Sequence, residues 1–78
     1  MTKLEEKIIN LISENLGVAK EEITPESSLR KDLGAEAFTI ADLLAKIQEE
    51  FNLDLEEVEA EKVKTVRELI NLVATEVE

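Results

Sequence analysis

The sequence predicts a small all-α domain with three main helices, one short helix and a long loop between the first two helices. Three segments carry apolar residues at helical spacing. Two of these segments open with a capping box, in which Thr2 pairs with Glu5 and Thr65 pairs with Glu68. A chain of 78 residues has room for one domain, residues 1–78, with a thin core. We therefore expect a bundle held together by the apolar faces of its helices.

The first and last helices are predicted by apolar stripes that follow the two capping boxes. The first helix should start after Thr2 and stop at Gly17, because glycine readily adopts the left-handed conformation that ends a helix. Its stripe consists of Leu4, Ile8, Leu11, Ile12 and Leu16. The last helix should begin after Thr65 and pack beside the first. Its stripe consists of Val66, Leu69, Ile70, Val73 and Val77.

A long loop is predicted from Val18 to Ala35, where the helical pattern breaks. Thr24 followed by Pro25 is typical of an N-cap and a first helical residue, which predicts a short helical turn inside the loop. Long loops in small domains are usually packed down or functional. The apolar residues that should pack this loop onto the core are Val18, Ile23, Leu29 and Leu33. The loop is also the least acidic region, because it contains Lys20, Arg30 and Lys31.

The second helix should run from about Glu36 to Phe51 and end at Asn52. Its apolar stripe consists of Ile40, Leu43, Leu44, Ile47 and Phe51. Its remaining face is acidic and is relieved only by Lys46. The acidic residues of that face are Glu36, Asp42, Glu49 and Glu50.

The segment 53–61 alternates apolar and acidic residues, as a strand would. A lone strand leaves its backbone unpaired, so we expect a short helix near Glu56 to Glu61 instead. Asn52, Asp54 and Glu56 are spaced like the start of a calcium loop, but that loop's glycine and distal glutamate are out of register. No specific metal site is therefore expected, only loose binding of divalent cations by the acidic face.

The composition narrows the classes of function. A net charge of −10 argues against nucleic acid and anionic membranes and favours basic patches on protein partners. The absence of histidine removes the commonest general base and leaves the serines at 13, 27 and 28 without an activating partner, so no enzyme activity is expected. The absence of cysteine excludes disulfides and thiolate metal sites. No apolar run suits a membrane span. We expect the protein to be cytoplasmic and monomeric. An alternative to partner binding is an acidic helical module whose charge serves only solubility.

The segment Asp32–Phe38 joins the loop to the second helix. Gly34 indicates a bend, and Glu36 should lie in the first helical turn, where unpaired N–H groups favour a negative charge. Such a helix entrance suits an anion such as a phosphate. Ala37 follows there, and its methyl group offers no chemistry.

Short segments along nearly the whole chain resemble the acyl carrier proteins, including the related peptidyl carrier domains. Leu16-Gly17-Val18 and Glu21-Glu22-Ile23 resemble the end of that family's first helix and the entry to its loop. Asp32-Leu33-Gly34-Ala35 matches the run before the carrier site, and Glu49-Glu50-Phe51 resembles the end of the second helix. The passage Ala60-Glu61-Lys62-Val63 resembles the join between the third and fourth helices.

The resemblance implies a four-helix bundle that carries acyl groups on 4′-phosphopantetheine, attached to the serine of an Asp-Ser-Leu motif. The matching positions here are Glu36, Ala37 and Phe38, so no cofactor is expected on this chain. An engineered Ser→Ala change would explain Ala37 alone, whereas Glu36, Phe38 and Thr39 favour natural divergence. The Phe38 ring is expected either to fill the acyl-chain space between helices or to cover the loop.

In this family, basic surfaces of acyl-metabolism enzymes recognise the acidic second helix. The resemblance therefore implies partner contacts in fatty-acid or related acyl metabolism. A merely solvated helix face is the alternative interpretation. The residues assigned to the contacts are Asp42, Glu49, Glu50, Glu56 and Glu57.

Overall fold

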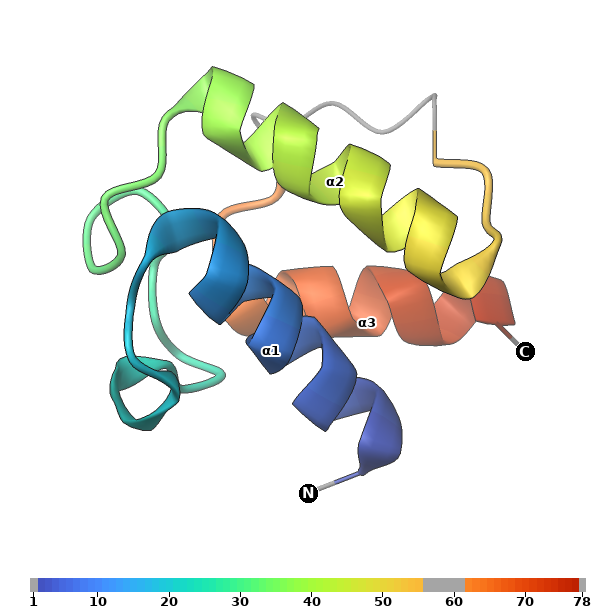
Figure 1. The fold of residues 1–78 in the computed structure, drawn as a ribbon, viewed down its shortest axis with the longest axis horizontal. Helices are drawn as coiled ribbons and strands as arrows, with labels where there is room; N and C mark the ends of the chain where they lie inside the picture. The colour runs from blue at the N-terminus through green and yellow to red at the C-terminus, as the bar shows by residue number, and fades with distance from the viewer. Residues whose placement is uncertain (1, 56–61, 78) are drawn as a thin grey trace.

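The structure is a computed structural model that describes residues 2–55 and 62–77. Within these residues it contains helices α1 (Lys3–Leu16), α2 (Ala37–Phe51) and α3 (Val66–Val77) and a 3-10 turn, η1 (Lys20–Glu22) (Figure 1). No strand occurs there, which confirms the all-α prediction. The short helix expected over Glu56–Glu61 lies outside the described residues. None of the described helices is long and apolar enough to span a bilayer.

The helix ends follow the predicted local signals. Thr2 Oγ1 accepts a hydrogen bond from the Glu5 N–H at 3.1 Å, and Glu5 Oε1 accepts one from the Thr2 N–H at 2.9 Å. The hydrogen bond from the Thr2 N–H, followed by that from the Thr2 side chain, lowers the pKa of the Glu5 carboxyl. Gly17 ends α1 with φ of 70°, and Asn52 ends α2 with φ of 55°, both in the left-handed region. Both predicted helix stops are confirmed.

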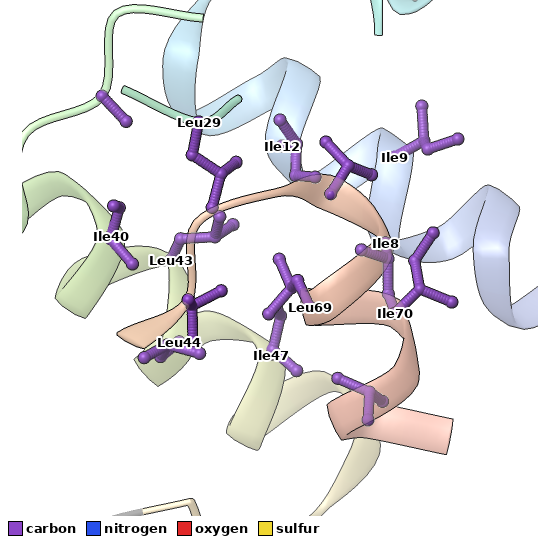
Figure 2. Packing of buried hydrophobic residues seen from close by; sticks show 14 of the residues in the cluster. Ile8, Ile9, Ile12, Leu29, Ile40, Leu43, Leu44, Ile47, Leu69 and Ile70 are labelled. Atoms are coloured by element: carbon purple, nitrogen blue, oxygen red, sulfur yellow. The ribbon is translucent and has the colours of Figure 1, made fainter. Parts of the chain in front are cut away.

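The apolar stripes of all three helices meet in one core, in which α1 lies against both α2 and α3. Figure 2 shows Ile8 and Ile12 of α1, Leu43 and Ile47 of α2 and Leu69 of α3 pointing toward one another. The loop contributes as predicted, because Ile23, Leu29 and Leu33 are buried and Val18 packs against the core. Leu29 has no exposed surface at all.

The helical turn predicted at Thr24-Pro25 is wrong. The loop does contain a short 3-10 turn, η1, but it lies before Thr24, and Thr24 itself begins a four-residue turn. The Ser27 N–H donates to the Thr24 carbonyl at 3.0 Å, and the Thr24 N–H donates to Ser27 Oγ at 3.0 Å. A helix cannot continue from there, because the Ser27 carbonyl accepts a bond from Val66 N–H of α3 at 3.1 Å. Tertiary pairing therefore overrides the local signal.

The loop is also joined to α3 by an ion pair between exposed side chains, Glu26 and Arg67. The hydrogen bond from the Arg67 guanidinium holds the pKa of the Glu26 carboxyl below its ordinary value. Because this carboxyl has a lower pKa in the folded than in the unfolded state, the ion pair stabilises the fold at pH values above the unfolded-state pKa. This contribution is lost as the pH falls through the folded-state pKa.

We therefore expect the wild type to be slightly more stable than Glu26→Gln at pH 7, with a difference that shrinks as the pH falls below the ordinary pKa of a glutamate and is lost below the lowered pKa of Glu26. Urea unfolding curves at several pH values measure this difference. Glu22→Gln is the control, because it also removes one exposed carboxylate but breaks no ion pair of the described residues. A gap for Glu26→Gln that persists unchanged at pH 3 would contradict the assignment.

Candidate functional site

The N-terminus of α2 is open, in contrast to the N-termini of the other two main helices. In α1 and α3 the capping boxes use the first N–H groups; Glu68 N–H, for instance, donates to Thr65 Oγ1 at 3.2 Å. The N-cap of α2 is Glu36, whose side chain makes no cap hydrogen bond. The N–H groups of the next three residues, 37–39, have no acceptor among the described residues. This end of α2 can therefore receive an external anion.

Glu36 was expected in the first helical turn, but it precedes that turn. Its backbone is extended, with φ of −108° and ψ of 171°, and its carbonyl accepts the first bond of α2, from Ile40 N–H at 2.9 Å. The reason is the chain's path into the helix, because the preceding Ala35 is buried and its N–H is bonded to the Leu29 carbonyl at 2.8 Å. The carboxylate of Glu36 is consequently left exposed in solvent.

The approach to α2 is shaped by Asp32 and Gly34. Asp32 Oδ2 accepts a hydrogen bond from the Ser28 N–H at 2.7 Å, while the Asp32 N–H donates to the Ser28 carbonyl at 2.9 Å. Gly34 has φ of +72°, and a Cβ added there would meet nothing within 4 Å. The requirement for glycine is therefore the left-handed backbone rather than close packing. Both residues shape the bend that presents the helix entrance.

Ala37 and Phe38 both face solvent at the start of α2. Phe38 is 72% exposed, so its ring does not fill the space between helices. That expectation is wrong, whereas the alternative that the ring lies over the loop stays a prediction. The physical reason is helical phase: the buried stripe of α2 begins at Ile40, which is about 200° around the helix from Phe38.

The predicted acidic face of α2 is present on its solvent side. Asp42, Glu49 and Glu50 are all exposed, and Asp42 Oδ2 accepts a hydrogen bond from Asn15 Nδ2 at 3.4 Å. Lys46 lies four residues after Asp42 and four before Glu50, so it sits within the acidic stripe. The remaining two contact residues of the prediction, Glu56 and Glu57, lie outside the described residues.

The spacing that resembles a calcium loop has a different use at its first position. Asn52 is the C-cap of α2, and its N–H donates to the Gln48 carbonyl. Glu56 lies outside the described residues. Across residues 2–55 and 62–77, no three acidic or other metal-ligating side chains come together as a candidate metal site.

Sequence reasoning missed the contribution of Ser28. Its N–H and carbonyl both bond to Asp32, and its carbonyl also accepts the Leu33 N–H at 3.1 Å. Ser28 further forms an isolated antiparallel bridge with Thr65, which joins the loop to the start of α3. A serine four residues before an aspartate in a polar loop was the available local signal. The pairing with Thr65 has no local signal, because it depends on the folded chain.

Comparison with known families agrees with this geometry. Residues 6–73, most of the chain, match the family model described as the phosphopantetheine attachment site. Domains of this family are not enzymes themselves and carry acyl groups for the enzymes with which they interact. The three described helices, the 3-10 turn and the absence of strands among the described residues are consistent with a small helical bundle of the acyl-carrier type. The chain belongs to the phosphopantetheine attachment-site family.

Proposed function

We propose that this protein is an acyl-carrier-like domain of fatty-acid or related acyl metabolism that acts without a covalently attached 4′-phosphopantetheine. The observation that carries the proposal is Ala37, the first residue of α2 and exposed to solvent. The resemblance to acyl carrier proteins assigns the attachment serine to this position. A phosphodiester needs an oxygen atom from the protein, and the methyl group of alanine has none.

The backbone around Ala37 suits a phosphate, but the attachment atom is missing. The open N–H groups at residues 37–39 would stabilise a phosphate's negative charge. The nearest hydroxyl along the helix belongs to Thr39, which is half-buried and about 200° around the helix from Ala37. The covalent group therefore does not fit this chain, and we propose no chemistry through it. The departures at Glu36, Phe38 and Thr39 favour natural divergence of the site.

The remaining function is contact with basic surfaces of acyl-metabolism enzymes through the exposed face of α2. Asp42, Glu49 and Glu50 supply negative charge on that face, and the net charge of −10 adds long-range attraction to a cationic partner. Phe38 lies on the same side as Asp42, four residues earlier, and its exposed ring offers an apolar contact at the N-terminal end of such an interface. The domain would serve as an adaptor or as a competitor for carrier-binding sites.

Charge reversal tests this contact surface. The double variant Glu49→Lys, Glu50→Lys should associate with a carrier-binding synthase about tenfold more slowly at low salt, because electrostatic steering is reduced. Stopped-flow or biosensor kinetics measure the rate, and the difference should shrink as salt is added. The opposite change, Lys46→Glu, removes the cation from the acidic stripe and should accelerate association.

A matched control separates the face of α2 from the net charge. Glu6→Lys combined with Glu76→Lys changes the net charge by the same amount, but on exposed positions of α1 and α3. This control should slow association much less than the α2 variant. If the two double variants slow association equally, net charge and not the face of α2 governs the rate. If neither variant changes the rate, the interface is not electrostatic.

A further inference from the structure

A basic cavity lies between the long loop and the start of α3. It has a volume of about 600 Å³. Among the described residues, its lining consists of Ser28, Arg30, Lys31, Val63, Lys64 and Thr65. Three of these six residues are cationic, in a chain that has only nine basic residues and a net charge of −10. The charge of this described lining is thus opposite to that of the molecule.

The two walls of this cavity come from distant parts of the sequence and are held together by backbone hydrogen bonds. The Leu29 N–H donates to the Lys64 carbonyl at 2.9 Å, and the Val66 N–H donates to the Ser27 carbonyl at 3.1 Å. Within the loop wall, the Lys31 N–H donates to Ser28 Oγ at 3.0 Å. The backbone that carries the three cations is therefore ordered before any ligand binds.

The charged ends of Arg30, Lys31 and Lys64 are available to a ligand. All three residues are exposed, and none of their side chains has an ion pair or hydrogen bond with the described residues. The neighbouring carboxylates bond to the backbone instead: Glu68 Oε1 accepts the N–H groups of Lys64 and Thr65 at 3.1 and 2.9 Å. Asp32 likewise accepts the Ser28 N–H. Because Glu68 occupies the N-terminus of α3, an anion here would be held by the side-chain cations rather than by the N–H groups of that helix.

We propose that this cavity binds a small phosphate-bearing anion. An arginine guanidinium offers two parallel N–H donors to phosphate oxygens, and the two lysines add point charges that suit a second or third negative charge. The cavity volume is in the range of small-molecule sites. Val63, which is buried, supplies an apolar wall for the organic part of a phosphate ester. This site is separate from the entrance of α2 and does not depend on the function proposed above.

Amide chemical shifts of the 15N-labelled domain test the proposal. Inorganic pyrophosphate, added at constant ionic strength, should cause saturable shifts confined to residues 28–31 and 63–65. Inorganic phosphate and glycerol 3-phosphate should act on the same amides more weakly, because they carry fewer charges. If glycerol 3-phosphate binds more tightly than inorganic phosphate, the natural ligand is an organic phosphate ester. If inorganic phosphate binds more tightly, the natural ligand is the free anion.

Single variants of the cavity show whether its cations hold the anion. Arg30→Gln and Lys64→Gln should each weaken pyrophosphate binding about fivefold, since each removes one charge-assisted contact. Lys46→Gln, an equal loss of charge at an exposed position of α2, should leave the affinity unchanged. Equal weakening by Lys46→Gln, or shifts spread over the whole surface, would overturn the proposal. The proposal would also be overturned if a polyglutamate peptide bound to this cavity and pyrophosphate did not, because the cavity would then be a contact surface for an acidic protein.

Discussion

Intact mass spectrometry should show no gain in mass when the wild-type protein is incubated with coenzyme A and a promiscuous phosphopantetheinyl transferase. The expected effect is all or none, because residue 37 supplies no oxygen for the phosphodiester and Thr39 is turned well away from it. A member of the family with an intact serine, treated in the same mixture, confirms that the transferase is active. A gain in mass for the wild type would end the proposal of an unmodified carrier domain.

Ala37→Ser is the informative counterpart. The first residue of α2 is exposed and the N–H groups beside it are open, so the restored hydroxyl should be accessible and the variant should gain the arm. The result separates two causes of a silent site. If Ala37→Ser stays unmodified, Glu36→Asp and Phe38→Leu are added to it, since these changes restore the rest of the family's motif. Modification only after those changes would show that the surroundings of the serine have diverged as well.

Leu29→Ala should cause the largest loss of stability among single changes in the loop. Leu29 is fully buried beneath the core faces of the helices. Truncating a buried leucine costs roughly 2–5 kcal/mol. A domain of this size has a total stability of only about 4–12 kcal/mol. The variant should therefore be partly unfolded at 37 °C, and urea or thermal unfolding followed by circular dichroism measures the loss.

Leu72→Ala is the control for this prediction. Leu72 lies on α3 and is only partly buried against the same core, so its truncation should cost clearly less. If the two variants lose equal stability, Leu29 of the loop contributes no more to the free energy of unfolding than a partly buried residue of a helix does. Leu29 also positions the candidate site, because its carbonyl accepts a hydrogen bond from the Ala35 N–H just before α2 begins.

The elements whose signals are local could be predicted from the sequence. Two helix ends are set by residues with a left-handed backbone, Gly17 and Asn52. The start of α1 is set by Thr2 together with Glu5, three residues later. The apolar stripes repeat within each helix, so the buried faces were also readable. The position of the site at the start of α2 followed from the resemblance in the run Asp32–Ala35.

The features that were predicted wrongly or missed involve contacts between distant residues. Thr24 and Pro25 carry a helix-start signal, but the chain around them bonds to Val66 and Arg67 of α3, with Arg67 N–H donating to the Pro25 carbonyl at 2.8 Å. The Phe38 ring was expected either to fill the space between helices or to cover the loop, and the first of these expectations is wrong. Its exposure depends on the phase of α2, which the position of Ile40 in the core determines.

The sequence by itself determined the helical class, the helix ends and the residues of the core, because each of these is a property of one residue or of one periodic segment. Only the tertiary structure decided that the N-terminus of α2 is open, that Phe38 faces solvent and that Arg30 and Lys31 face a cavity shared with Lys64. The cavity arises because backbone groups far apart in the chain pair with each other, as Leu29 does with Lys64, and such pairing leaves no pattern in a local stretch of sequence. The other two features depend on the exact residue at which α2 begins and on how that helix is turned against the core.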